Sequence, residues 1–430
     1  MCAPLPKPDA ALPKVSALSN GVRVVCDPML GLETLALSVV AGRGARAEDP
    51  ARSGWSHLLE HMVFKGAGDR SARDIVEAIE AEGGSINAAT SYERTSFQVR
   101  ALKGGLRLGL DVTADLMLRP RIDPADLVRE KQVIGQEIAE AADAPDDLVF
   151  ELAQTAAFEG QPLGRPILGS VDSIATADPG QLATWRAGLY APDQVVVSAA
   201  GAVEAAELED MAEAAFGQAK SAGLATPEPA GFVGGTRPLA KPLEQANLVM
   251  LLPAPGARDP DYFVLRLLAE ILGGGMASRL FQEARERRGL AYAIDAYSET
   301  YADVGVLGVF AGCAAADAAE LAQVTAGELA GMTRGVEAAE LARAKAQLKA
   351  ALFMSRESAS SRAELAGAQV LLFGRPLSPR ELAAEIDVVE AADIARLAGA
   401  IIGQGRSAVA VLGPRKALPA AKAFQRALGV

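Results

Sequence analysis

Both histidines of this chain lie in one short segment, His57-Leu58-Leu59-Glu60-His61. On an α-helix, residues i and i+4 share a face, so the two imidazoles could bind a single metal ion. Glu60 follows His57 by three residues and points to nearly the same side. Two histidines scattered through 430 residues would rarely fall four apart with a glutamate between them. The spacing therefore predicts a metal site on a helix, provided that the fold supplies the remaining ligands.

Two imidazoles suit zinc, which in catalytic sites takes three protein ligands and one water. The chain has no further histidine and its cysteines are poorly placed, so we expect a carboxylate as the third ligand. Zinc lowers the pKa of bound water to about 7 and polarises a carbonyl group. Glu60 lies beside the ligands and would act as general base, passing the proton of the water to a leaving amine. We expect one zinc ion per chain.

The third ligand has several candidates on a helix expected over residues 124–142. They are the carboxylates Asp126, Glu130, Glu137 and Glu140. Glu130 and Glu137 are seven residues apart, two turns along one face, so both could approach the metal. A solvated acidic face would explain any one of these residues equally well. Spacing alone leaves the third ligand open.

The elements that must position these residues follow from hydrophobic periodicity and turn signals. Ser71 is a candidate N-cap of a helix over 71–81, with Asp74 three residues later as in a capping box. The strands expected in the first half are 21–25, 35–40, 85–89, 94–100 and 195–199, and the other helices are 106–118, 124–142, 146–158, 179–189 and 205–216.

The chain repeats itself after a segment rich in proline and glycine, which predicts a linker. Gly44-Ala45-Arg46 recurs as Gly256-Ala257-Arg258, and Asp49-Pro50 recurs as Asp259-Pro260. Similar matches continue as far as Gly160 and Pro162, which recur as Gly374 and Pro376, with small drifts in offset, as insertions and deletions in a duplicated domain would produce. We therefore divide the chain into a zinc-binding domain (1–222), a linker (223–238) and a second homologous domain (239–430).

The second copy has apolar residues opposite the expected ligands. Leu267 and Ile271 correspond to the two histidines, and Ala351 corresponds to Glu137. If the histidines were needed only for packing, there would be less reason for the two copies to differ at these positions. The comparison predicts that the first copy binds the metal and that the second keeps the fold without it.

The run Gly54 to Gly66, which contains H-x-x-E-H, resembles the pitrilysin-type inverzincin metallopeptidases. It is most similar to the branch of the mitochondrial processing peptidase and its bacterial relatives. Residues 83–95 resemble the strand pair that follows the motif in this family, and residues 129–138 resemble its ligand helix. The resemblance implies that Glu137, 76 residues after His61, is the third ligand and that Glu130 supports the site.

The resemblance extends over nearly the whole chain and implies an α+β fold. Each of the two homologous domains would be a largely antiparallel sheet covered by helices. Residues 272–281 resemble the family's glycine-rich turn, and Arg285 and Tyr292 resemble its Arg/Tyr pair. The implied roles are binding of the substrate carbonyl and stabilisation of the tetrahedral intermediate. The residues alone would favour an exposed basic helix end for Arg285 and a strand core for Tyr292.

The resemblance also implies how the substrate binds and how the chain assembles. An extended peptide would add to the strand at 85–89, with Asn87 and Ala88 in contact, inside a closed chamber. A two-domain chain with both motifs suggests a homodimer, or a heterodimer with a paralogue, in which Arg285 and Tyr292 act on the partner's zinc. The expected function is a zinc endopeptidase of peptides or unfolded segments. The alternatives are a non-catalytic structural or assembly subunit of the family, and a binding module with a structural metal.

Charge and composition exclude several other classes. The net charge of −12 argues against nucleic acid, which needs a basic surface. No apolar run has the length of a membrane span, and the first 17 residues lack the apolar core of a secretory signal. Cys2, Cys26 and Cys313 form no paired motif, which favours a reducing compartment. These features predict a cytoplasmic protein with no membrane partner.

Overall fold

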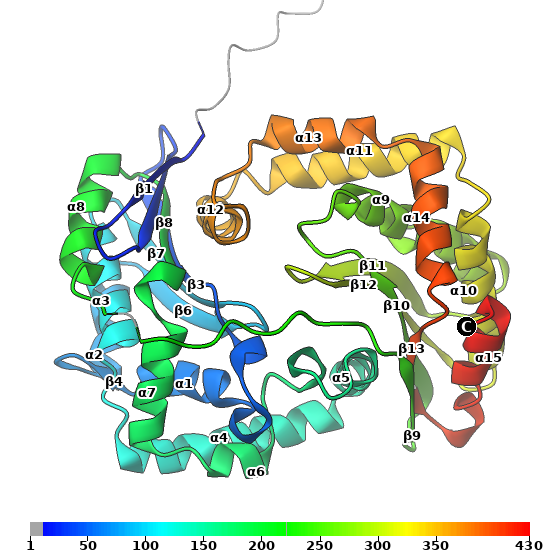
Figure 1. Cartoon of the computed structure of the whole chain (residues 1–430), viewed down its shortest axis with the longest axis horizontal. Coiled ribbons are helices and arrows are strands. Elements are labelled where there is room, and N and C mark those ends of the chain that lie inside the picture. Colours follow the sequence, from blue (N-terminus) through cyan, green and yellow to red (C-terminus); the bar gives the residue numbers. More distant parts are fainter. Residues whose placement is uncertain (1–11, 221) are drawn as a thin grey trace, which may run out of the picture.

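Two halves, each a sheet with helices packed on it, lie side by side in the computed structural model (Figure 1), which describes residues 12–220 and 222–430. Cys2 lies outside the described residues, and so does most of the 17-residue N-terminal segment that lacks the apolar core of a secretory signal. No helix in the described ranges combines the length and the apolar character needed to span a membrane.

The first half contains a six-stranded sheet in the order β1-β2-β8-β3-β7-β6. Only the β2–β8 pair is parallel. Its strands are β1 (Lys14–Ala17), β2 (Arg23–Pro28), β3 (Thr34–Ala41), β6 (Ser85–Thr90), β7 (Thr95–Leu102) and β8 (Val195–Gly201), with a small ribbon of β4 (Gly66–Ala67) and β5 (Arg70–Ser71). Its helices are α1 (Trp55–Val63), α2 (Ala72–Ala81), α3 (Leu106–Leu118), α4 (Pro124–Asp143), α5 (Pro145–Ala157), α6 (Val171–Ala175), α7 (Pro179–Leu189) and α8 (Ala205–Phe216).

The second half contains a five-stranded sheet in the order β11-β12-β10-β13-β9, in which only the β13–β9 pair is parallel. Its strands are β9 (Gly235–Ala240), β10 (Gln245–Ala254), β11 (Ala293–Thr300), β12 (Gly305–Ala314) and β13 (Ala408–Gly413). Its helices are α9 (Tyr262–Gly273), α10 (Ala318–Met332), α11 (Ala338–Met354), α12 (Ala359–Phe373), α13 (Pro379–Val388), α14 (Ala391–Gly403) and α15 (Ala420–Leu428), with a π-helical segment over Phe281–Arg287.

The two sheets have the same topology, which confirms the duplication. With β1 set aside, the order β2-β8-β3-β7-β6 matches β9-β13-β10-β12-β11, and the single parallel pair occupies the same place in both. The helices correspond in chain order as well, with α1 matching α9 and α4 matching α11. The expected α+β fold of two largely antiparallel, helix-covered sheets is therefore confirmed.

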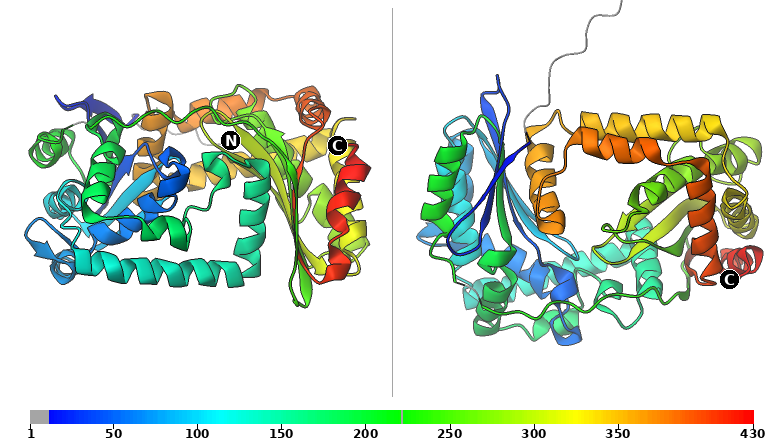
Figure 2. Two further views of the ribbon diagram at one scale, coloured as in Figure 1. Left: turned by 60° about the horizontal axis from the view of Figure 1, so that its bottom comes forward. Right: turned by 45° about the horizontal axis from the view of Figure 1, so that its top comes forward.

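Each half also contributes one helix to the other half, as the views in Figure 2 show. Helix α5 packs through Val149 and Ala153 against Val249 and Leu251 of the second sheet. Helix α12 covers the opposite sheet through side chains that include Ala366 and Val370, buried with Val25 and Val196 of β2 and β8. Because α5 and α12 are equivalent in the duplication, the exchange is reciprocal and ties the two halves together.

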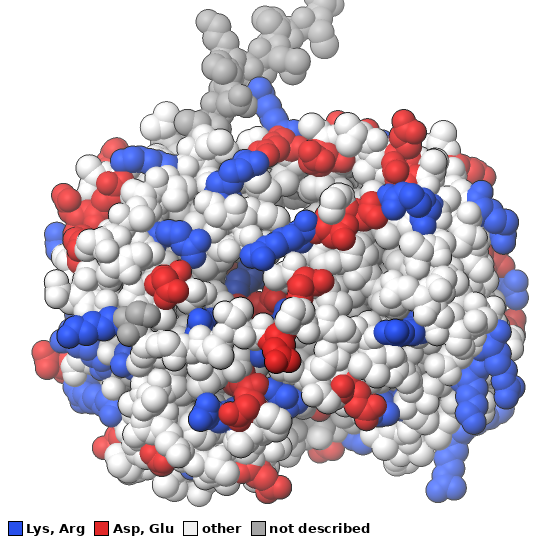
Figure 3. Space-filling view, in the orientation of Figure 1, with Lys and Arg blue, Asp and Glu red and all other residues white. Residues whose placement is uncertain are grey.

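Arg46 adds a polar connection between the halves. Its guanidinium donates to both carboxylate oxygens of Asp303, at 2.7 and 2.6 Å, and to Glu93 at 2.6 Å. It also donates to the carbonyl of Glu228, and Asp303 accepts from the N–H of Ala230. Both of these residues lie between the end of α8 and the start of β9, where the described residues form no helix or strand. Basic and acidic side chains are interspersed over this face of the molecule (Figure 3).

Candidate active site

Helix α1 presents the H-x-x-E-H residues on one side because its other side is apolar. Trp55, Leu58, Leu59, Met62 and Val63 are buried in the core of the first half. His57, Glu60 and His61 are only partly buried, on the side of α1 that faces α4 and β6. The structure therefore places the two histidines on one helical face, and their ring centroids are 4.7 Å apart.

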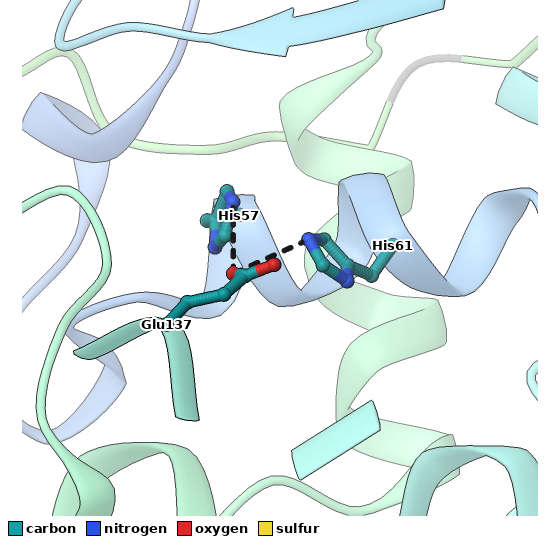
Figure 4. Close-up of side chains that lie close together, drawn as sticks. All are labelled: His57, His61 and Glu137. Atoms are coloured by element: carbon teal, nitrogen blue, oxygen red, sulfur yellow. Dashed lines mark ion pairs between the residues drawn. The ribbon is translucent and has the colours of Figure 1, made fainter. Parts of the chain in front are cut away.

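Glu137 of α4 reaches between the two histidines (Figure 4). Its Oε2 lies 3.6 Å from Nε2 of His61 and 3.9 Å from Nε2 of His57. Oxygen and nitrogen ligands around one tetrahedral zinc lie roughly 3.4 Å apart, so small side-chain adjustments would let these three atoms bind one ion. Among residues 12–220 and 222–430, these three form the one group of three or more His, Cys, Asp or Glu side chains suited to a metal.

The other carboxylates of α4 have different partners. Glu130 is 5% exposed, and its Oε2 lies 3.1 Å from Nδ1 of His61. Its second oxygen forms an ion pair with Lys65 at 2.8 Å. A carboxylate on Nδ1 makes that nitrogen the donor and leaves Nε2 free for a metal. Asp126 instead pairs with Arg129, and Glu140 is exposed.

The electrostatics of α1 suit a metal-activated water. Burial, with a smaller contribution from neighbouring His61, lowers the pKa of His57 to about 4, so the imidazole is neutral and able to bind a metal. Burial also raises the pKa of Glu60, while Thr90 and His61 partly oppose this shift. Oε2 of Glu60 and Nδ1 of His57 are buried without a hydrogen-bond partner. An unpaired buried carboxylate oxygen is costly, and the free oxygen of Glu60 fits a site built to hold a water.

Strand β6 forms an open edge of the first sheet beside α1, since β7 is the one strand that pairs with it among the described residues. In the hairpin that joins β6 to β7, the N–H of Ser91 donates to the carbonyl of Arg94, so these two residues form a hydrogen-bonded pair. Hydrogen-bonded and non-bonded pairs alternate along an antiparallel ladder, so the main-chain groups of Ile86, Ala88 and Thr90 point away from β7. Ala88 fits the expected peptide contact. The main chain of Asn87 is paired with β7, so this register corrects that part of the expectation.

Arg285 and Tyr292 lie in the second half of the chain. Arg285 belongs to the π-helical segment and stacks on Phe281, 4.7 Å from the ring centroid. Tyr292 immediately precedes β11 and is 61% exposed, so the strand-core interpretation is wrong. Among the described residues, no hydrogen bond or ion pair joins either side chain to α1 or α4. The fold leaves both side chains accessible from outside the chain.

In the second copy the positions of the two histidines are apolar and buried, whereas Ala351, opposite Glu137, is exposed. Leu267, Ile271 and Ala344, opposite His57, His61 and Glu130, are all buried in the core of the second half. Glu270, opposite Glu60, keeps its carboxylate, and burial raises its pKa. The two halves therefore share a fold but differ in the side chains that could bind a metal.

A cavity of about 1140 Å³ lies elsewhere, between the two halves. Its walls include Arg43, Arg46, Asp259, Leu352 and Leu372, and none of the expected site residues lines it. Basic and acidic side chains both contribute to these walls, so no single ligand charge is favoured. The H-x-x-E-H residues lie beside the open edge of β6 and not in this cavity.

One residue that positions α1 was missed from the sequence. The carboxylate of Glu48 is 4% exposed and accepts the N–H groups of Gly54 and Ser56 at the start of the helix. Two signals could have indicated it. The N-cap of the helix is a glycine, which has no side chain to cap the free N–H groups, and the second copy has no residue opposite Glu48.

The sequence matches the two family models of one peptidase family. Residues 31–171 match "Insulinase (Peptidase family M16)" and residues 176–348 match "Peptidase M16 inactive domain". A Rickettsia bellii protein named "uncharacterized zinc protease" is 35% identical over 406 residues, which is 93% of this chain and 97% of the relative. A Bacillus subtilis relative, also named a zinc protease, is 34% identical over 405 residues, 93% of this chain and 98% of the relative.

The fold agrees with a solved structure described as a protease from Helicobacter pylori. The TM-score is 0.85 at 22% identity, covering 94% of this chain and all of the other. At that identity the likeness concerns the fold alone, whereas the family models and the curated relatives identify the family. The chain belongs to peptidase family M16.

Proposed function

We propose that this chain is a zinc-dependent endopeptidase that hydrolyses peptides or unfolded segments. The observation that carries the proposal is the convergence of His57, His61 and Glu137, with Glu60 beside them on the same helix. Three protein ligands with room for water are typical of catalytic zinc, whereas structural zinc has four protein ligands. The names of the relatives as zinc proteases support the same chemistry.

The residues of α1 and α4 have different roles in the proposed reaction. His57, His61 and Glu137 would hold one zinc ion, which would polarise the scissile carbonyl and acidify a bound water. Glu60 accepts the proton of the attacking water and then donates it to the leaving amine. Burial raises the pKa of Glu60, which makes its carboxylate a stronger proton acceptor than that of an exposed glutamate. Glu130 holds the ring of His61 in the tautomer and orientation that the metal needs.

The edge of β6 supplies the substrate site in this proposal. The outward main-chain groups of Ile86, Ala88 and Thr90 would pair with an extended peptide. Thr90 lies next to Glu60, so a peptide on this edge runs past the general base. Pairing through the main chain makes few demands on side chains and excludes folded proteins, whose backbone groups are already bonded.

The remaining site residues come from a second subunit. We propose a dimer, of two identical chains or of this chain with a paralogue, that closes a chamber around the peptide. In this arrangement Arg285 would bind the substrate carbonyl, and Tyr292 would donate a hydrogen bond to the oxygen that gains negative charge, beside the partner's metal site. The exposure of both side chains is compatible with this role.

The direct test compares wild type with Glu60→Gln, using zinc content and cleavage of unstructured fluorogenic peptides. We expect one zinc per chain in both proteins and cleavage by wild type only, with a loss of at least 100-fold in Glu60→Gln, as is typical for a general base. Chelation of the metal should abolish wild-type cleavage. Zinc binding without cleavage of a broad peptide library would overturn the proposal in favour of a structural or assembly subunit.

A further inference from the structure

The metal-binding helix α1 begins in a way that leaves it without a cap of its own. Its N-cap is Gly54, in the left-handed conformation with φ of +89°. A Cβ at this position would lie 2.5 Å from the carbonyl oxygen of Leu168, so the tight contact with the neighbouring loop requires glycine. The residues that normally cap helices, Ser, Thr, Asp and Asn, are therefore excluded here.

Glu48, six residues before Gly54, supplies the missing acceptors. Its Oε2 accepts the Gly54 N–H at 2.8 Å and its Oε1 accepts the Ser56 N–H at 2.7 Å. The carboxylate is 4% exposed, and burial raises its pKa to about 7. Burying a carboxylate is unfavourable unless hydrogen bonds and local charge offset the cost, and the positive end of a helix contributes to both.

The segment from Glu48 to Ser56 is itself fixed at several points. Arg165 donates a hydrogen bond to the main-chain oxygen of Glu48. The hydroxyl of Ser173 donates to the carbonyl of Ser53 at 2.6 Å, and the indole N–H of Trp55 donates to the carbonyl of Ser173 at 3.1 Å. Because this segment is fixed, the hydrogen bonds of the Glu48 carboxylate to Gly54 and Ser56 hold the first turn of α1 in one position.

The second copy lacks this device. Gly256-Ala257-Arg258 matches Gly44-Ala45-Arg46 and Asp259-Pro260 matches Asp49-Pro50, so Glu48 has no counterpart in the second copy. The guanidinium of Arg258 donates to the carbonyl of Leu372, and α9 has no side-chain cap. The buried carboxylate cap thus occurs in the copy that carries the ligands and is missing from the copy that lacks them.

We propose that Glu48 is a positioning residue for the zinc site, fixing the first turn of α1 and thereby His57. Ser56, whose N–H it binds, immediately precedes His57 in the chain. A shift or rotation of this turn would displace the His57 imidazole from its place opposite Glu137. The inference rests on the proposed function, because it assumes that the three ligands bind zinc.

The test measures the zinc dissociation constant by competition with a chelator, in wild type, Glu48→Gln and Ser71→Ala. Glu48→Gln keeps the size of the side chain but replaces one acceptor oxygen with a donor. Ser71→Ala is the matched control, since Ser71 caps α2, which carries no site residue. We expect zinc affinity to fall about 10- to 100-fold in Glu48→Gln, as for other supporting groups of metal ligands, and to stay within twofold in Ser71→Ala.

Peptide cleavage by zinc-saturated enzyme gives a second readout. Because the Glu48 carboxylate bonds to the start of α1 and not to β6, we expect kcat to fall in Glu48→Gln while KM stays within twofold. Glu48→Asp replaces Glu48→Gln if the latter does not fold, since it keeps the charge but is too short to reach both N–H groups. Wild-type zinc affinity in a folded Glu48 variant, or an equal loss in Ser71→Ala, would overturn the inference. Failure of wild type to bind zinc would instead overturn the proposed function.

Discussion

The carboxylates Glu130 and Glu137 lie seven residues apart on α4 but have different surroundings. Glu137 faces both histidines, whereas buried Glu130 contacts the far nitrogen of His61 and pairs with Lys65. In the proposed function, this difference separates a metal ligand from a residue that orients one. Spacing on the helix put both residues on one face but could not assign these roles.

Glu130→Gln should weaken zinc binding without abolishing it. The amide cannot accept the N–H of His61 as a carboxylate does and cannot pair with Lys65, so the ring loses its fixed orientation. We expect zinc affinity to fall about 10- to 100-fold, measured by chelator competition. Glu140→Gln, at an exposed position of the same helix, should leave the affinity unchanged. Equal affinities in all three proteins would show that Glu130 has no role at the metal.

The sequence was sufficient to predict that His57, Glu60 and His61 share one face of a helix, because a helical repeat dictates which residues lie on the same side. It was insufficient for Glu48, whose bonds go to main-chain N–H groups and leave no pattern of side-chain types. Tyr292 was also misjudged from its residues alone. An aromatic residue at the start of a strand is usually buried, but here the chain turns it outward.

At the scale of elements, helices α3, α7 and α8 span the predicted residues, and Ser71 with Asp74 forms the predicted capping box. Local rules of periodicity and capping determine these features. The reciprocal packing of α5 and α12 could not be predicted in the same way. An amphipathic pattern shows which face of a helix is apolar, but not which of two similar sheets covers it.

The open edge of β6 predicts a pattern in the substrate. A peptide added as a strand offers every second N–H to β6, so N-methylation at alternate residues should remove these bonds. Each lost bond costs about 1 kcal/mol, which corresponds to a rise of about fivefold in KM. Methylation at the intervening residues, which point away from β6, serves as the control. Effects that do not alternate along the peptide would exclude strand addition.

At the scale of the whole molecule, the two halves of the chain carry different parts of the proposed site. The zinc ligands belong to the first half, and Arg285 and Tyr292 belong to the second. The halves are held together by exchanged helices and by Arg46, so a large rearrangement within one chain would break many contacts. A second chain offers a route to a complete site without such a rearrangement.

Mixed dimers test this arrangement. A Glu60→Gln subunit paired with a Tyr292→Phe subunit would contain one fully intact site if Tyr292 acts on its partner's zinc. We expect such heterodimers, purified with two different tags, to recover about half of wild-type activity, since one of two sites is intact. Homodimers of either variant should be inactive or strongly impaired. Heterodimers no more active than these homodimers would place Tyr292 in the same site as its own chain's zinc, or outside the site.

The most direct measurement of the central claim is a crystal structure of zinc-loaded Glu60→Gln with an unstructured peptide, using anomalous scattering at the zinc edge. The proposed function predicts one zinc bonded to Nε2 of His57, Nε2 of His61 and a carboxylate oxygen of Glu137, at about 2.0–2.2 Å. The peptide should lie along β6 with a carbonyl group at the metal. Zinc at another place, or a peptide bound away from β6, would contradict the proposal.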